Sequence, residues 1–403
     1  MEQRTLGKLP ITSSLSNRPD SEGAANKTAF NMGMRGRKSS KSPPVFSHEF
    51  VIQNHADITS CVAMVFVIGL MFQATSPVAS LFVTLQHNIT VNATDSTEPL
   101  FLFTCGLKDI FTTFFYLLIC IIAHAVVQEY VLDKLNRKMH LSKVKHSKFN
   151  ESGQLMTFYF ASAVWGADTI IREGFHNINQ LWEGYPTSHA NMTFIVKFYF
   201  LVQLAYWLHC FPELYFQKIK KEEMKGRITY CMLYLIFIAG AYAMNFTRVA
   251  MLMLVLHYLV EFVFHLARLI YFADKQEMAG HCFMVFDVLF VLVRLGSITL
   301  AVLTFWYGLQ QSSQDSIDIA TGNFNTKIFR IYCLLATCLL QAWMMWNFLT
   351  FQLRRLRERT VYTRKLRSPT KKKGKVQEED ISSLPEVDQN TAQNGLRPRK
   401  VKK

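Results

Sequence analysis

Four ionisable residues recur along one apolar stretch in the second half of the chain. They follow one another at intervals of four, four and three residues, which places them all on one face of an α-helix. The four are His257, Glu261, His265 and Arg268. Imidazole and carboxylate groups can bind metal ions or move protons. These groups extend over about 12 Å of helix at 1.5 Å per residue, so a shared metal ion is not expected.

The next apolar stretch carries Asp287 and Arg294, which lie seven residues apart and therefore on one helical face. We call these two and the preceding four the polar stripe. Ionisable residues inside membrane spans are costly and indicate a functional site by default. Because a short connector joins the two stretches, Asp287 and Arg294 are the expected partners of the other four. The stripe is either a structural row of ion pairs and hydrogen bonds or the lining of a polar, lipid-accessible groove.

No local motif indicates a catalyst or a bound cofactor. The chain lacks a Gly-x-Ser-x-Gly turn, a phosphate-binding glycine-rich loop, a His-Glu-x-x-His run and a Cys-x-x-Cys pair. His124, His209 and Lys197 stand alone in apolar stretches and are expected to be satisfied core or interfacial residues. We therefore expect no catalytic residue, no metal site and no cofactor.

The elements that must position the polar stripe are long apolar segments. Half of the 403 residues are apolar, only 18% are charged, and the charges lie mainly at the ends and in short connectors. This composition excludes a disordered chain, and basicity confined to tails and loops argues against a nucleic-acid-binding module. We predict an all-α polytopic membrane protein with about eight transmembrane helices.

The eight predicted spans are 58–82, 110–132, 155–171, 192–216, 228–244, 249–272, 282–309 and 328–353. Pro77 is expected to kink the first. The third and fifth are short, and if they are re-entrant only six or seven segments cross the membrane.

The distribution of basic residues predicts the topology. With an even number of spans, the two tails and the connectors on their side carry 36 Lys and Arg, whereas 86–107, 174–191 and 309–325 carry none. The positive-inside rule then places both termini in the cytosol.

Glycosylation sequons give a second indication of topology. Asn88 and Asn92 lie in the first non-cytosolic loop and are the expected glycan sites. Asn191 abuts a span and Asn245 lies in a tight turn, so both have poor access. The sequons at Asn26 and Asn150 are cytosolic in this topology and should stay bare.

The C-terminal tail is strongly basic, beginning with Arg354 and Arg355 and including Lys371, Lys372 and Lys373. It is either a solvated disordered tail that obeys the positive-inside rule or a segment attracted to anionic headgroups or ribosomal RNA.

Five stretches of sequence resemble one known family. They are 54–58 (NHADI), 127–134 (VQEY and DK), 148–154 (KFNESGQ), 203–218 (QLAYWLHCFPELYFQK) and 321–325 (TGNFN). Over about residues 40–360 the chain resembles the translocating-chain-associating membrane (TRAM) protein family of the TLC-domain superfamily. The resemblance implies a multi-pass protein of the endoplasmic reticulum that sits beside the Sec translocon and contacts nascent chains.

The resemblance also implies a domain organisation. A cytosolic N-terminal tail (1–50) precedes a transmembrane pair with a glycosylatable lumenal loop (51–147). A TLC-like transmembrane domain (148–357) follows, and a basic, disordered cytosolic tail (358–403) ends the chain.

The TLC fold is shared with ceramide synthases, which supplies an enzymatic alternative. Those enzymes carry an adjacent His pair and, about 26 residues later, a His-Asp pair. When their Leu-His-Asp is aligned with residues 256–258, the His pair falls on Tyr230 and Cys231, so one of four catalytic positions survives. A general base needs a titratable group within reach of the substrate, so we expect no enzyme.

The expected function is therefore that of a non-enzymatic accessory that assists translocation or membrane insertion of nascent proteins. It would act by contacting the nascent chain, by modulating the local bilayer, or by both. The expected partners are the Sec translocon channel, nascent polypeptide chains, the ribosome–translocon complex and membrane lipids, with no specific nucleic acid. One alternative is a lipid-binding or lipid-scrambling TLC protein, and a further alternative is a ceramide-synthase-like acyltransferase.

Overall fold

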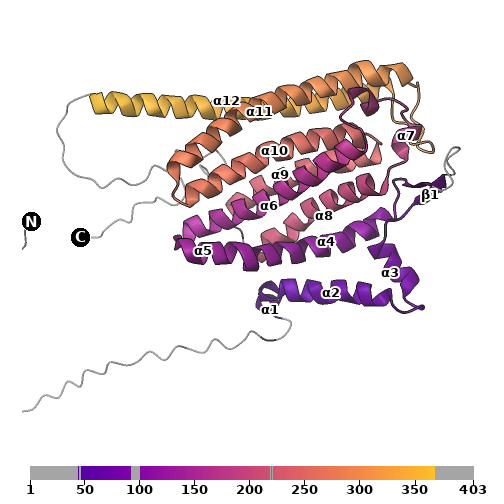
Figure 1. The fold of residues 1–403 in the computed structure, drawn as a ribbon, viewed down its shortest axis with the longest axis horizontal. Coiled ribbons are helices and arrows are strands. Elements are labelled where there is room, and N and C mark those ends of the chain that lie inside the picture. The colour runs from indigo at the N-terminus through magenta and orange to yellow at the C-terminus, as the bar shows by residue number, and fades with distance from the viewer. Residues whose placement is uncertain (1–43, 45–46, 92–99, 218, 220, 368–403) are drawn as a thin grey trace, which may run out of the picture. The chain divides into compact units, whose positions relative to one another are not determined.

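The computed structural model describes residue 44 and residues 47–91, 100–217, 219 and 221–367. These residues are almost entirely helical, and Figure 1 shows the long helices lying alongside one another. The all-α class predicted from the sequence is confirmed. Most of the predicted tails, and the sequons at Asn26 and Asn92, lie outside the described residues.

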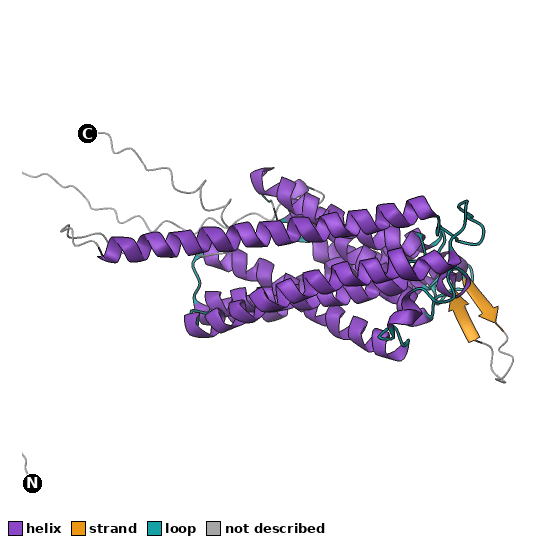
Figure 2. Cartoon of the chain, turned by 90° about the horizontal axis from the view of Figure 1, so that it is seen from above, coloured by secondary structure: helices purple, strands orange, loops and turns teal. Residues whose placement is uncertain are grey.

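The first part of the described chain contains one two-stranded antiparallel hairpin, in which β1 (Asn88–Val91) pairs with β2 (Leu100–Phe103). The helices are α1 (His48–Gln53), α2 (His55–Gly69), α3 (Ser76–Val83), α4 (Asp109–Val126), α5 (Asp133–Met139), α6 (Lys143–Arg172), α7 (Thr187–Ala190), α8 (Phe194–Phe216), α9 (Lys221–Ala243), α10 (Thr247–Phe272), α11 (Gln276–Ala301) and α12 (Lys327–Arg367). Figure 2 shows the hairpin at one end of the helices.

Six helical segments of the described chain are long and apolar enough to cross a membrane, where the sequence predicted about eight. They are Asp109–Met139, Phe194–Phe216, Lys221–Ala243, Thr247–Phe272, Gln276–Ser312 and Lys327–Glu358. The fifth predicted span, considered as a possible re-entrant segment, is part of the continuous helix α9 of 23 residues.

The first predicted span is divided into two helices. Helix α2 has 15 residues, fewer than the roughly 20 needed to cross the hydrocarbon layer. The chain turns at 70–75 and resumes as α3, whose first turn contains Pro77. Proline fits there because the N–H that it lacks has no partner in the first turn of a helix. The interruption falls where a kink was predicted.

The third predicted span lies within α6, a continuous helix of 30 residues. Helix α6 is not among the six apolar segments. The first half of this helix is charged, and the second half contains polar residues such as Ser162 and Asp168. Helix α6 makes its most extensive contact with α10. Protein packing, rather than lipid, therefore covers much of its surface.

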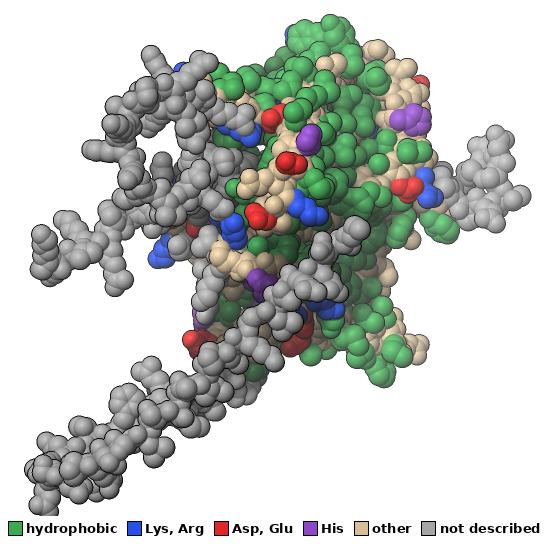
Figure 3. Space-filling model, turned by 60° about the vertical axis from the view of Figure 1, so that its left-hand side comes forward, with side chains coloured by type: hydrophobic (Ala, Val, Ile, Leu, Met, Phe, Trp, Pro, Cys, Tyr) green, Lys and Arg blue, Asp and Glu red, His purple; other side chains and the backbone are tan. Residues whose placement is uncertain are grey.

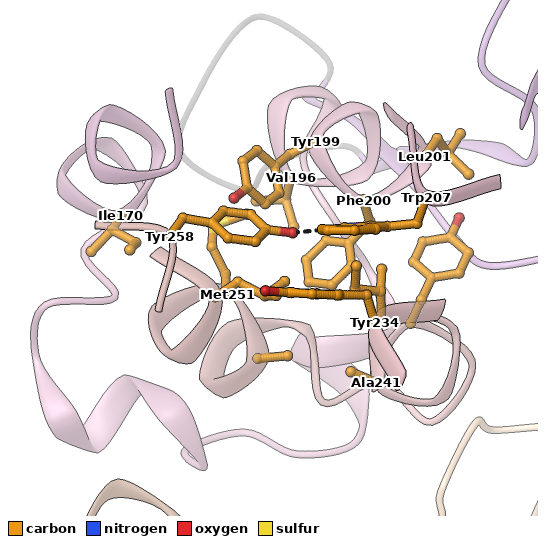
Figure 4. Packing of buried hydrophobic residues seen from close by; sticks show 14 of the residues in the cluster. Ile170, Val196, Tyr199, Phe200, Leu201, Trp207, Tyr234, Ala241, Met251 and Tyr258 are labelled. Carbon is orange, nitrogen blue, oxygen red and sulfur yellow. Dashed lines mark hydrogen bonds between the residues drawn. The ribbon is translucent and has the colours of Figure 1, made fainter. Parts of the chain in front are cut away.

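Aromatic side chains from α6, α8, α9 and α10 fill the centre of the bundle. The rings of Trp207 and Tyr234 stack 3.7 Å apart. The Trp207 indole N–H donates to the Tyr258 hydroxyl at 3.1 Å, as Figure 4 shows, and that hydroxyl donates to Gln203 at 3.0 Å. Each buried polar atom of this group has a partner, as the low-dielectric interior requires.

The outer helices present apolar side chains to their surroundings. Only 11% of the apolar window of α12 is buried, and Trp343 and Trp346 on this helix are exposed. In Figure 3, apolar side chains cover most of the visible surface of the described bundle, and charged side chains form a few patches. Such a surface suits a lipid environment.

A buried ion pair fastens the hairpin end of the bundle. Lys197 Nζ of α8 lies 2.7 Å from Asp109 Oδ1 at the start of α4, and both side chains are almost fully buried. The same ammonium donates to the carbonyls of Gln86 and Thr104, on either side of the hairpin. Tyr242 of α9 donates to the other Asp109 oxygen at 2.7 Å. Lys197, predicted to be a satisfied core residue, thus joins three helices and a loop.

Candidate functional site

A hydrogen-bonded chain of polar side chains crosses the interior of the bundle. Its centre is Arg294 of α11, which donates through Nη2 to His257 Nδ1 at 2.7 Å and through Nη1 to Gln341 Oε1 at 2.9 Å. A guanidinium cannot accept a hydrogen bond, so Nδ1 is the acceptor and a neutral His257 carries its proton on Nε2. That nitrogen lies 2.5 Å from the Tyr234 hydroxyl.

Three tyrosines extend the chain across the bundle. The hydroxyl of Tyr234 lies 3.3 Å from that of Tyr230 on the same helix, and Tyr230 lies 2.7 Å from Tyr159 of α6. We call the connected set the polar network. It joins five helices, and its members are Tyr159, Tyr230, Tyr234, His257, Arg294 and Gln341.

The polar network is mostly buried and reaches the surface at Tyr230. Arg294 and Tyr159 are fully buried, whereas Tyr230 is 37% exposed. Glu261 lies one turn from His257, and its Oε1 is 3.9 Å from His257 Nε2. The His257 side chain is 17% exposed and the Glu261 side chain is 16% exposed. These partly exposed residues lie on α9 and α10, two of the six apolar segments.

Two further members of the polar stripe, His265 and Arg268, pack against aromatic rings. His265 is buried and stacks on Tyr159 with the ring centres 5.7 Å apart. Arg268 is buried, with its guanidinium 5.7 Å and 5.9 Å from the rings of Phe264 and Phe272. The stripe therefore faces the bundle, as its cost in lipid requires.

Asp287 was expected to partner the stripe but lies apart from the polar network. Its Oδ1 accepts from Gln352 of α12 at 2.7 Å. The structure thus brings His257, Glu261 and Arg294 together and leaves Asp287 in a separate contact between α11 and α12.

Sequence reasoning missed the three tyrosines and Gln341. Tyr230 and Tyr234 are four residues apart on one helical face, a spacing that could have indicated them. Tyr159 and Gln341 have no such signal, because their partners lie on other helices and are distant in the sequence.

Two residues of α9 stand at the positions aligned with the adjacent His pair of ceramide synthases. Tyr230, at the position aligned with a catalytic His, bonds to tyrosines, and Cys231 beside it is buried. Within the described residues, no group of three or more His, Cys, Asp or Glu side chains is arranged to hold a metal ion. The chemistry available is proton donation and acceptance by hydroxyl, imidazole and carboxyl groups.

A small cavity of about 150 Å³ lies at the hairpin end, near the start of α10. Arg248 at its edge donates to the carbonyls of Gln180 and Ser188, both at 2.9 Å. Burial and the nearby Arg248 lower the pKa of His189 to about 3, so this imidazole is neutral at physiological pH. These contacts hold the loops together at this end.

The asparagine side chains of the sequons differ in their exposure and in whether the Nδ2 atom, which would carry the glycan, is hydrogen-bonded. Asn88 is exposed at the start of β1, whereas Asn245 is buried and donates from Nδ2 to the Gly322 carbonyl at 2.9 Å. Asn191 donates from Nδ2 to Thr187 at 3.2 Å. The structure thus leaves Asn88 accessible and engages Asn191 and Asn245 in hydrogen bonds.

Replacing Asn88 and Asn92 together by Gln should abolish the glycosidase-sensitive gel shift of the protein made in microsomes. The matched control, Asn191→Gln with Asn245→Gln, should leave the shift unchanged because those nitrogens are engaged. A shift that survives the first pair would contradict the predicted lumenal placement of the hairpin.

The fold and the polar network together define a polytopic helical membrane protein with polar groups shared among its central helices. The TLC domain family model matches residues 148–350. Translocating chain-associated membrane protein 2 of Homo sapiens is 49% identical over 326 residues, which cover 81% of this chain and 86% of that protein. Its Mus musculus counterpart is 48% identical over the same shares. The chain belongs to the translocating chain-associated membrane protein family, and the resemblance drawn from the sequence is confirmed.

Proposed function

We propose that this protein is a non-enzymatic accessory of the Sec translocon in the endoplasmic reticulum membrane. It would assist translocation or insertion of nascent secretory and membrane proteins while both of its termini face the cytosol. Its human and mouse relatives are named for their association with translocating chains, which supports this proposal. The observation that carries it is the partial exposure of Tyr230, His257 and the neighbouring Glu261 on two apolar helices.

The physical basis is the cost of polar groups in lipid. Each backbone N–H or C=O left without a partner in the hydrocarbon region costs several kcal/mol. A nascent segment that leaves the translocon before its own helix is complete carries such groups. The Tyr230 hydroxyl and the Glu261 carboxyl offer them hydrogen-bond partners at membrane depth, and the surrounding apolar surface of α9 and α10 accepts the apolar side chains.

A photoreactive phenylalanine derivative placed at single positions of α9 tests this proposal. Tyr230 and Met232 are 37% and 42% exposed, and two residues on a helix point about 200° apart. The probe at Tyr230 should cross-link short nascent chains on stalled ribosomes in microsomes, and the probe at Met232 should do so several-fold less. Equal cross-linking yields from both positions would contradict a role for the partly exposed Tyr230 in contacting nascent chains.

The same experiment addresses the lipid-handling alternative. The partly exposed Tyr230 and Glu261 side chains could also contact a phospholipid headgroup that enters the bilayer interior. In that case the probe at Tyr230 would label phospholipid, with or without a ribosome, and would not label the nascent chain.

We also propose that the protein has no ceramide synthase activity. Acyl transfer in that family needs four residues, and Tyr230 and Cys231 replace two imidazoles here. Purified protein in liposomes, given a long-chain base and an acyl-CoA, should form no more ceramide than empty liposomes do. Product formation above that background would overturn this part of the proposal.

A further inference from the structure

Helix α12 is twice as long as a membrane requires. It runs for 41 residues from Lys327 to Arg367, which is about 60 Å at 1.5 Å per residue, whereas the hydrocarbon layer is about 30 Å thick. The last predicted span ends at Leu353, so residues 354–367 continue the helix beyond the membrane. Figure 1 shows this end of α12 extending past the neighbouring helices. We call residues 354–367 the basic extension.

The basic extension was predicted to pass into a disordered tail at residue 358, but it is helical through Arg367. It contains seven basic residues and one acidic residue, Glu358. The basic residues are Arg354, Arg355, Arg357, Arg359, Arg364, Lys365 and Arg367. Successive residues of a helix are about 100° apart, so these positions fall on all sides of the helix. The extension is therefore a cationic rod.

The geometry points to a polyanion in solution rather than to the membrane surface. A helix that lies on a membrane needs an apolar face to embed. The half of the helix that carries Leu353, Leu356, Tyr362 and Leu366 also carries Arg355, Arg359 and Arg367 at 100° per residue. Attraction to headgroups decays within about 8 Å at physiological salt, or about five residues of a helix that leaves the membrane. Arg364, Lys365 and Arg367 lie beyond that reach, roughly 15–20 Å along the axis from Leu353.

We propose that the basic extension binds the phosphate backbone of double-stranded RNA, independently of base sequence. This rests on the proposed function, because a ribosome on the translocon presents RNA stems to the cytosolic side. Guanidinium groups pair with phosphates through two parallel hydrogen bonds. Six of the seven cations are arginines, and their backbone is already helical through Arg367, so it need not be ordered on binding.

The test measures RNA binding by the full-length protein in nanodiscs of neutral phospholipid. The probe is a short fluorescent RNA duplex followed by anisotropy at physiological salt. The helix variant carries Gln at Arg357, Arg359, Arg364, Lys365 and Arg367, and leaves Arg354 and Arg355, close to the α11 contact, unchanged. The control variant removes the same charge beyond the described helix, with Gln at Lys371, Lys372, Lys373, Lys375 and Arg397.

The helix variant should bind the duplex at least about ten-fold more weakly, and its salt dependence should flatten because fewer counterions are released. The control variant should lose less than about three-fold. Equal losses in the two variants, or no binding by the unchanged protein, would overturn the proposal. A third result would also overturn it. If the unchanged protein in nanodiscs of anionic lipid lost as much RNA binding as the helix variant does in neutral lipid, the membrane would be the partner of the basic extension.

Failure of this inference can be separated from failure of the proposed function. The helix variant, with the photoreactive probe at Tyr230, should still cross-link nascent chains on ribosomes that other contacts hold at the translocon. If the RNA assay fails while this cross-link persists, only the role of the basic extension is lost. If the cross-link is absent from the unchanged protein, the proposed function fails regardless of RNA binding.

Discussion

Lys197→Met should destabilise the protein more than any exposed substitution. It leaves the Asp109 carboxylate buried without its cation and removes the donor to the carbonyls of Gln86 and Thr104. Breaking a buried pair from one side typically costs about 3–5 kcal/mol. We expect a clear fall in the midpoint of thermal unfolding and in the folded fraction on size-exclusion chromatography in detergent.

Two variants provide the controls for Lys197→Met. Arg172→Met removes an exposed ion pair within one helix, to Asp168, and should change folding little. Lys197→Met combined with Asp109→Asn removes both charges and should recover part of the loss. An unfolding midpoint for Lys197→Met equal to that of Arg172→Met would show that the buried pair does not hold the hairpin end in place.

The second large effect is expected at Arg294. Arg294→Met removes the donor to both His257 and Gln341 from a fully buried site. Three helices lose their shared contact, and each buried acceptor that is left without a donor costs about 1–3 kcal/mol. We expect poor accumulation in microsomes, measured by immunoblotting, because the buried Arg294 links α11 to both α10 and α12.

Glu261→Gln is the matched variant at the exposed end of the same region. Glu261 is partly exposed, and its 3.9 Å distance from His257 is too long for a hydrogen bond. We expect normal accumulation together with reduced cross-linking of short nascent chains per folded molecule. Reduced accumulation without loss of cross-linking would make Glu261 structural. Normal accumulation with normal cross-linking would remove it from both roles.

Hydropathy predicted the helices better than it predicted their number in the membrane. An apolar run of sufficient length reveals a helix, and each predicted span lies largely in helical chain. It does not reveal an interruption such as the turn at 70–75, because all the residues there except Gln73 are also apolar or small. Nor does it show that α6, with its polar residues, is covered by α10.

The candidate site was predictable only where partners share a helix or lie on two helices that a short connector joins. Spacing identified His257 and Glu261, and the short connector after α10 indicated Arg294. Lys197 was predicted to be satisfied, but the spacing could not show that Asp109 satisfies it from 88 residues earlier. Gln341 was missed for the same reason. Contacts between distant helices depend on how the bundle packs, which local periodicity does not encode.

The polarity of α6 has a consequence for the synthesis of this protein. A helix that is too polar to enter lipid alone must wait for the helix that covers it, and α10 ends at Phe272, a hundred residues after Arg172 ends α6. At roughly 5–20 residues per second, that delay is on the order of 5–20 s. During this interval α6 needs a protected environment beside the channel. The protein should therefore depend, for its own insertion, on the kind of assistance that it is proposed to give to others.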